Sequence, residues 1–301
     1  MNLLIITDLH LAAAKPAGRI GDYIADVEAK LDEIIAISRE YSIAAVLCAG
    51  DLFHRPDVPF SAVSRFISFI ERLDRRFITI PGSHDLFGNN LDSLSRTAVG
   101  LLSRLGCIEL LLPELRPATR VGSMSIGIAG SKVFDIELVH GAVLPKPDFG
   151  EYTLLENYKT DARIVVVGHY HNGYDAVEVN GHMFVCPGSL IRTSASTTEL
   201  LRRPRVAIVT DTYKVTWREL ESAKEGYEVL SPPVVVPKLD VTGLIQDWKV
   251  STMESIDAIS LLKELGSKEN IQQKYVDYAL NRLEAKRYDV RGENSKTKAG
   301  S

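Results

Sequence analysis

The feature that most constrains the fold is a series of short apolar runs, each followed within two residues by an aspartate or a glycine. Residues 3–7, 44–49 and 77–80 are such runs, and the segments between them, 23–39 and 63–73, repeat apolar residues at helical spacing. Strand, helix, strand, helix, strand with short links predicts βαβ units and at least one partly parallel sheet.

Strands dominate the middle of the chain, where the helical spacing of apolar residues fades from about residue 108. Six further strands are predicted, at 125–129, 136–140, 164–168, 182–186, 206–210 and 213–219. A second sheet packed on the first accounts for them. We therefore predict an α/β fold in which two mixed β-sheets form a sandwich flanked by helices.

The chain divides into four predicted parts. Residues 1–220 form the sandwich domain, and residues 221–250, which include Ser231-Pro-Pro, form an extended connector. Residues 251–290 form a small C-terminal helical extension of two helices. The polar residues 291–301 are predicted to be a disordered tail.

Composition restricts the class of protein and its surroundings. The net charge of the 301 residues is −4, so a nucleic-acid partner would have to be met by a local patch or by bound cations. Three widely spaced cysteines without a C-x-x-C pair argue against a disulfide framework or structural zinc and favour a reducing compartment. The N-terminal apolar run is too short for a signal peptide and no run could span a bilayer, which predicts a cytoplasmic protein without membrane contact.

Five polar clusters carry the chemistry, and four of them directly follow a predicted strand. Loops at strand ends converge on one edge of an α/β sheet, so these side chains are expected to meet. Imidazole and carboxylate without thiolate suit manganese, iron or zinc, and a carboxylate such as Asp51 can bridge two cations. The clusters are Asp8-Leu-His10, Gly50-Asp51, Gly82-Ser83-His84-Asp85, His140-Gly141 and Gly168-His169-Tyr-His171.

Each cluster taken alone also has a structural interpretation, as a cap or a turn. Five of the seven histidines fall in the clusters, however, which makes coincidence the minor explanation. His182 lies outside them. It follows Asn180-Gly181 in a predicted hairpin turn and is expected to be a surface residue.

The ordered clusters resemble the calcineurin-like metallophosphoesterase superfamily, whose pattern is D-x-H, G-D, G-N-H-[DE], H and G-H-x-H. The resemblance covers about residues 1–215 and implies a metallophosphoesterase fold, with catalytic residues in the domain 1–220. It implies two divalent metal ions, with Asp51 bridging them, and a catalytic His84 that stabilises or protonates the leaving oxygen. The implied first metal set is Asp8, His10, Asp51 and His171, and the implied second set is Asp51, Ser83, His140 and His169.

Two segments also resemble SbcD-type nucleases, the nuclease half of the complex that repairs double-strand breaks in DNA. Gly50-Asp-Leu-Phe-His54 resembles their G-D-L-F-H segment, in which the histidine helps to orient the DNA phosphate, and Pro187-Gly-Ser resembles their P-G-S segment. The alternatives are an exposed loop residue for His54 and a simple turn for Pro187-Gly-Ser.

The nuclease branch implies a manganese-dependent exonuclease or endonuclease acting in DNA repair and recombination. It also implies a homodimer with an SMC-like ATPase partner, which would dock on the helices within 251–290. The alternative is that these helices pack on the chain's own core. Two other functions stay open: a small-molecule phosphodiesterase or phosphatase, and a scaffold with a weakened metal site.

Ser83 departs from the superfamily pattern, which has asparagine at this position as a ligand of the second metal. A serine hydroxyl is shorter and a weaker donor, so weaker binding of the second metal is expected; divergent members of the branch, virus-encoded ones included, tolerate other residues here. Asp85 follows His84 directly. It is expected either to orient His84 through a hydrogen bond or to cap the loop.

Overall fold

The computed structural model describes residues 1–129, 134–148, 150–193 and 196–230. They all lie in the first of two compact units of the chain, Met1–Val234. The predicted helices within 251–290, the predicted tail and residues 231–250 of the predicted connector lie outside the described residues.

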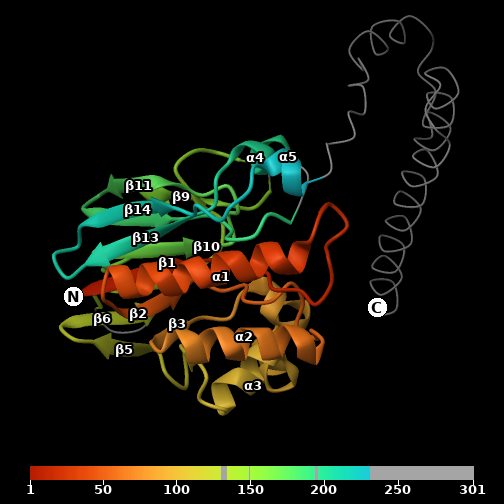
Figure 1. The fold of residues 1–301 in the computed structure, drawn as a ribbon. Helices are drawn as coiled ribbons and strands as arrows, with labels where there is room; N and C mark the ends of the chain where they lie inside the picture. The colour runs from red at the N-terminus through yellow and green to blue at the C-terminus, as the bar shows by residue number, and fades with distance from the viewer. Residues whose placement is uncertain (130–133, 149, 194–195, 231–301) are drawn as a thin grey trace, which may run out of the picture. The chain divides into compact units, whose positions relative to one another are not determined.

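The first sheet has six strands in the order β14-β13-β1-β2-β3-β4 (Figure 1). Its four central and edge strands run parallel: β1 (Asn2–Ile6), β2 (Ile43–Cys48), β3 (Arg76–Thr79) and β4 (Glu109–Leu110). The other side of β1 is completed by two antiparallel strands, β13 (Arg205–Thr210) and β14 (Val215–Glu219).

The second sheet also has six strands, in the order β11-β12-β10-β7-β6-β5. Four parallel strands form its centre: β6 (Met124–Ile128), β7 (Ile136–His140), β10 (Ile164–Gly168) and β12 (His182–Cys186). Antiparallel strands close the two edges, β5 (Ala118–Val121) and β11 (Tyr174–Val179). A short parallel pair, β8 (Val143–Leu144) and β9 (Thr153–Leu154), stands apart.

Strand β1 shows why the two sheets and the helices form layers. Its alternating side chains divide between two cores: Leu3 and Ile5 face the second sheet, while Leu4 and Ile6 face the helices. All four are completely buried. An unbroken apolar run is what a strand covered on both faces requires, and the predicted sandwich of two mixed sheets flanked by helices is confirmed.

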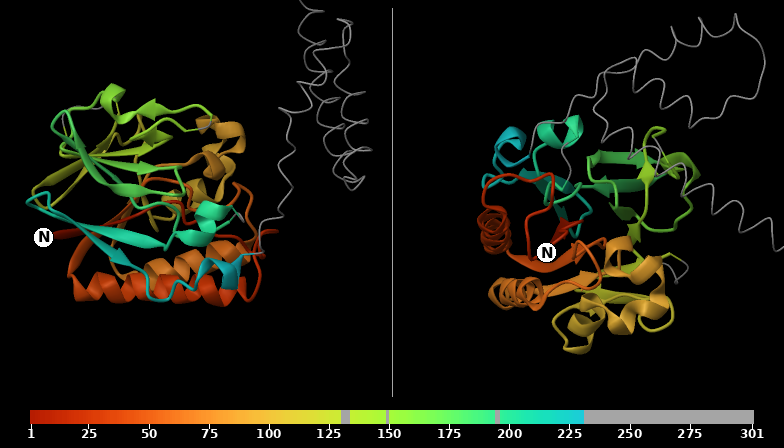
Figure 2. Two further views of the ribbon diagram at one scale, coloured as in Figure 1. Left: turned by 90° about the horizontal axis from the view of Figure 1, so that it is seen from above. Right: turned by 90° about the vertical axis from the view of Figure 1, so that its right-hand side faces the viewer.

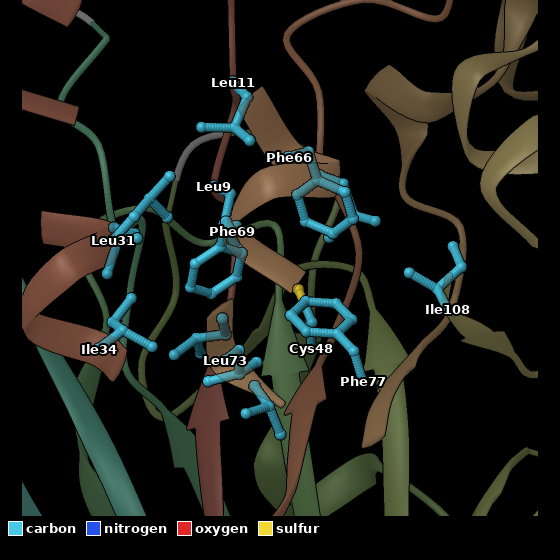
Figure 3. Packing of buried hydrophobic residues seen from close by; sticks show 14 of the residues in the cluster. Leu9, Leu11, Leu31, Ile34, Cys48, Phe66, Phe69, Leu73, Phe77 and Ile108 are labelled. Atoms are coloured by element: carbon cyan, nitrogen blue, oxygen red, sulfur yellow. The ribbon is translucent and has the colours of Figure 1, made fainter. Parts of the chain in front are cut away.

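Helices α1 (Tyr23–Glu40) and α2 (Phe60–Leu73) lie side by side on the outer face of the first sheet, with α3 (Ala98–Arg104) beyond them (Figures 1 and 2). The start of α1 is set by Asp22, whose side chain accepts a hydrogen bond from the Ala25 N–H. Phenylalanine rings fill the space between α2 and β3, as Figure 3 shows for Phe66, Phe69 and Phe77.

Several short or peripheral elements were not predicted, among them the strands β5 and β11 and the helix α3. Both strands lie at sheet edges and are half-exposed, so their sequences lack the apolar runs of the central strands. Strand β12 begins at His182, which was expected on the surface. Its ring is half-buried, with Nδ1 2.6 Å from the carbonyl oxygen of Ala162.

Residues 221–230, the first ten of the predicted connector, pack on the sandwich instead of extending away from it. They include the short helix α5 (Gly226–Val229). The N–H groups of Glu221 and Ser222 donate to the Glu33 carboxylate of α1, and Leu230 forms an antiparallel β-bridge with Arg19.

Among the described helices, none is both long and apolar enough to cross a membrane.

We predict that Phe66→Ala lowers the free energy of unfolding by about 3–5 kcal/mol, the usual cost of removing a buried phenyl ring. Phe66 is completely buried, and its ring centroid lies 5.4 Å from that of Phe77 and 5.7 Å from that of Phe53. Urea unfolding followed by circular dichroism measures the change. Phe60→Ala on the same helix is the matched control, because Phe60 is 85% exposed and its loss should change little.

Candidate active site

The candidate site lies where the carboxyl ends of parallel strands from both sheets meet. Asp8 follows β1, Asp51 follows β2 and Ser83 follows β3 in the first sheet, while His140 ends β7 and His169 follows β10 in the second. The register of the strands aligns their carboxyl ends within each sheet. Ile6 pairs with Cys48, Cys48 with Thr79, and Gly168 with His140. The structure thus brings together residues that are up to 161 positions apart, as the strand-end argument predicted.

Four of the candidate metal ligands have a backbone that side chains rarely adopt. The φ angles are +50° at Asp8, +44° at His10, +54° at Asp51 and +83° at His169. Non-glycine residues in this region are held there at a cost of about 1–3 kcal/mol each, and they cluster at functional sites. Two backbone hydrogen bonds hold the loop after β1 against the loop after β2. The Asp8 N–H donates to the Gly50 carbonyl oxygen, and the His10 N–H donates to the Asp51 carbonyl oxygen.

Gly82 allows the loop after β3 to approach the loop after β2. A Cβ atom at this position would lie 2.1 Å from the Asp51 Oδ1 atom and 2.3 Å from its backbone nitrogen. No side chain fits there. The close approach lets the His84 N–H donate to Asp51 Oδ1 at 2.8 Å, which fixes one oxygen of this carboxylate.

The predicted first metal set is assembled in the structure. Ligand atoms of Asp8, His10, Asp51 and His171 all lie within 4.8 Å of one another. The Nε2 atoms of His10 and His171 are 2.8 Å apart, and His10 Nε2 is 3.5 Å from Asp51 Oδ2. Nitrogen lone pairs that converge in this way on a carboxylate oxygen suit a shared cation.

The predicted second metal set is assembled beside it, with Asp51 common to both. Atoms of Asp51, His140 and His169 lie within 4.8 Å of one another, and His140 Nε2 is 3.4 Å from Asp51 Oδ2. His140 Nδ1 lies 2.7 Å from the carbonyl oxygen of Ala49. A carbonyl only accepts, so Nδ1 carries a hydrogen, and Nε2 is the ring atom that could bind a metal once it has given up its own proton.

Ser83 also faces the second set. Its Oγ atom is 3.5 Å from His140 Nε2. The residue as a whole is half-buried. The structure places Ser83 where the superfamily pattern has its asparagine.

The Asp51 carboxylate provides the test of whether a metal pair fits these residues. Its Oδ2 atom is buried and has no hydrogen-bond partner among the described residues, yet it faces Nε2 of both His10 and His140. A buried carboxylate oxygen without a donor is costly, and a bridging position between two cations would satisfy it. Apart from the Ser83 hydroxyl, the donors are imidazole and carboxylate, so the site fits two divalent metal ions.

Charges in the site follow from the same arrangement. Burial alone would raise the pKa of Asp51, but the His140 and His10 imidazoles beside it outweigh burial and hold the pKa below its usual range. Burial alone would lower the pKa of His140, but Asp51 and Asp8 raise it to about 9. For His10, burial dominates and lowers the pKa well below its usual value. The Asp51 carboxylate is therefore ionised at neutral pH.

His84 and His54 lie together at the edge of the first metal set. Their ring centroids are 5.6 Å apart, and that of His10 is 4.7 Å from His84 and 5.8 Å from His54. His84 is exposed and His54 is half-buried, so a ligand can reach both. His84 Nδ1 lies 2.9 Å from the carbonyl oxygen of His54, which orients the His84 ring.

Asp85 corrects one expectation. Its carboxylate accepts hydrogen bonds from three backbone N–H groups, those of Gly82, Leu52 and Phe53, at 2.9–3.2 Å, while the His84 ring is oriented by the His54 carbonyl. Asp85 is completely buried, and burial together with the Asp51 charge raises its pKa to about 7. Its place is that of a loop-capping carboxylate that ties the loop after β2 to the loop after β3.

Sequence reasoning missed the contacts that support these loops. Ser189 and Thr7 link the Pro187-Gly-Ser segment to the Asp8 loop through their hydroxyl groups. The only signal for them was the Pro187-Gly-Ser segment itself, which had been noted for its resemblance and not for any contact.

Comparison with known proteins adds one family and a few distant folds. A family model described as calcineurin-like phosphoesterase matches residues 1–212. No curated protein sequence matches the chain. Among solved structures, a novel archaeal phosphodiesterase superposes with a TM-score of 0.42 and 16% identity, over 73% of this chain and 100% of that chain.

Two further solved structures are similarly distant. A predicted phosphoesterase from Streptococcus pneumoniae has a TM-score of 0.35 and 16% identity, over 72% of this chain and 88% of its own. A protein from Thermus thermophilus has a TM-score of 0.42 and 12% identity, over 73% of this chain and 98% of its own.

The family match alone spans well over half of the 301 residues, and it shows that the chain belongs to the calcineurin-like phosphoesterase family of metal-dependent phosphoester hydrolases.

Proposed function

We propose that this phosphoester hydrolase is an SbcD-like DNA nuclease that cleaves phosphodiester bonds with two divalent metal ions, Mn²⁺ by preference. The observation that carries the proposal is the position of His54. The loop after β2 brings it beside His84 and His10, with one nitrogen of each ring within 4.8 Å of the others. His54 thus lies beside the candidate metal ligands and is half-buried rather than an exposed loop residue, which supports the proposal drawn from the segment's resemblance to the nucleases.

The two proposed metal sets have distinct members. The first ion would be held by Asp8, His10 and His171, the second by His140, His169 and Ser83, with Asp51 shared. Such a pair lowers the pKa of bound water and neutralises charge on the phosphate. The chain's own contribution is to fix the ligand atoms beforehand, which it does through the loop-to-loop hydrogen bonds described above.

His84 would move its proton at Nε2. Because its Nδ1 faces the His54 carbonyl oxygen at 2.9 Å, Nδ1 carries a hydrogen in either charge state of the ring. Nε2 is therefore the atom that gains or gives up the catalytic proton. As a general acid there, His84 would protonate the leaving sugar oxygen, while His54 would orient the DNA phosphate.

The openness of one side of the site supports a polymeric substrate. His84 and His169 are exposed, whereas His10, Asp8 and Asp51 are buried beneath them. A phosphodiester within a long chain can approach from the exposed side without entering an enclosed cavity. The proposal further includes a homodimer and an SMC-like ATPase partner that docks on residues 251–290.

The nuclease proposal predicts manganese-dependent degradation of linear DNA by the full-length protein, alone or with its ATPase partner. We expect His84→Ala to slow cleavage by about a hundredfold or more, the usual contribution of a general acid, and to leave Mn²⁺ binding unchanged. Labelled linear DNA resolved on gels measures the rate. His182→Ala is the matched control, because the His182 ring of β12 contacts the Ala162 carbonyl oxygen. This substitution should leave the rate of DNA cleavage unchanged.

Two other results would reject this proposal. Turnover of bis-p-nitrophenyl phosphate without any attack on DNA would indicate a small-molecule phosphodiesterase. No turnover of either substrate, with Mn²⁺ bound or not, would indicate a scaffold.

We predict that Ser83→Asn tightens the weaker of two Mn²⁺ binding steps by about tenfold, the scale on which single groups around a metal change its affinity. The amide oxygen of asparagine reaches further than the Ser83 hydroxyl, which is 3.5 Å from His140 Nε2. Isothermal titration calorimetry of the parent and the variant resolves the two steps. Equal affinities in both proteins would refute the expected effect of Ser83.

A further inference from the structure

The Pro187-Gly188-Ser189 segment lies between the loops that carry two of the proposed first-metal ligands. Ser189 is completely buried. Its neighbour on one side is Thr7, with which it forms a parallel β-bridge directly after β1. On the other side its N–H donates to the carbonyl oxygen of His171 at 3.0 Å. Ser189 thus joins the first sheet to the second at their catalytic ends.

The Ser189 hydroxyl acts on the strained backbone of Asp8. Its oxygen lies within hydrogen-bond distance of two carbonyl oxygens, those of Asp8 at 2.9 Å and Ile191 at 2.5 Å, which share its one hydrogen. The Leu190 N–H donates to the same Asp8 carbonyl at 3.2 Å. Because Asp8 has a φ angle of +50°, its peptide requires such fixed partners to keep a carboxylate oxygen within 4.8 Å of the ligand atoms of His10 and His171.

The segment can pass this close to His171 because residue 188 is glycine. A Cβ atom on Gly188 would lie 2.5 Å from the carbonyl oxygen of His171, and its φ angle is +84°. The Thr7 hydroxyl donates to the Gly188 carbonyl at 3.1 Å. Each residue of Gly188-Ser189 therefore contacts a first-metal loop.

Arg202 holds the Pro187-Gly188-Ser189 segment in place through the Ser189 carbonyl oxygen. Its guanidinium donates to the Ser189 carbonyl oxygen at 2.6 Å and forms a two-point pair with Glu199 at 2.7 and 3.0 Å. The side chains of Arg202 and Glu199 are 10% and 3% exposed, so the pair is shielded from solvent. Such a planar pair is rigid, and it fixes the position of Ser189.

We propose that Ser189 is a positioning residue, which sets the geometry of the first metal set by tying the Asp8 loop to the His171 loop, with Arg202 holding it in place. The inference rests on the proposed two-metal site. It does not depend on DNA as the substrate. Ser189 touches neither the metals nor the substrate, and acts only through the backbone of Asp8 and His171.

The test is Mn²⁺ binding to the full-length protein with Ser189→Ala. We expect the tighter of the two binding steps, assigned to the first set, to weaken by about tenfold or more, while the weaker step changes less. Electron paramagnetic resonance of unbound Mn²⁺ counts the bound ions directly, without any substrate. Hydrolysis of bis-p-nitrophenyl phosphate by the variant should recover as Mn²⁺ is raised.

The matched control is Ser38→Ala, which also removes a buried serine hydroxyl. Ser38 lies on α1, and its Oγ has no hydrogen-bond partner among the described residues. It should leave Mn²⁺ binding unchanged. Arg202→Gln is a second variant, and it should shift the tighter step in the same direction as Ser189→Ala by a smaller factor.

Three results overturn the inference, and they differ from failure of the nuclease proposal. One is Mn²⁺ affinity in folded Ser189→Ala equal to that of the parent, with only thermal stability lowered. The second is an equal loss of affinity in Ser38→Ala, and the third is no Mn²⁺ binding by the parent, which also removes the two-metal site. A parent that binds Mn²⁺ and leaves DNA intact rejects the nuclease alone, since the affinities still decide the role of Ser189.

Discussion

The candidate site depends on the Asp51 carboxylate more than on any other group. One of its oxygens is fixed by the His84 N–H, and the other is buried without a donor between the imidazoles of His10 and His140. This arrangement requires both sheets, because His10 comes from the first and His140 from the second. It also requires glycine at position 82, since any side chain there would occupy the space of the carboxylate.

The sheets can meet in this way because their facing surfaces are uniformly apolar. Leu3, Ile5 and Leu47 of the first sheet pack against residues such as Ile136 and Val166 of the second, all fully buried. Interiors of this kind are close-packed and resist displacement. The strand ends therefore have fixed relative positions, and these positions restrict the loops that carry the candidate metal ligands.

The sequence was sufficient for those parts of the protein that depend on local pattern. The central strands can be recognised from their apolar runs, and α1 and α2 from apolar residues at helical spacing. The fold class could therefore be predicted. The meeting of the candidate ligands could be predicted because their clusters stand at or just after strand ends, and parallel strands align their ends. The half-exposed edge strand β11 has no such run, and it was missed.

Contacts made through the backbone could not be predicted, because the sequence pattern does not encode which carbonyl or N–H group a side chain reaches. Asp85 is the clearest case. Its position next to His84 left open a contact with that ring or a role as a loop cap, and the structure directs its carboxylate at the N–H groups of Gly82, Leu52 and Phe53. The positive φ angles of Asp8 and Asp51 were equally hidden.

The two proposed metal sets differ in how the chain supports them, and this asymmetry bears on function. The first is buried and backed by a second layer of contacts through Ser189 and Arg202. The second opens toward solvent at His169 and has a hydroxyl at Ser83 in place of an amide. A rigid first position and a looser second one agree with the expectation that the second ion is the more weakly bound of the two.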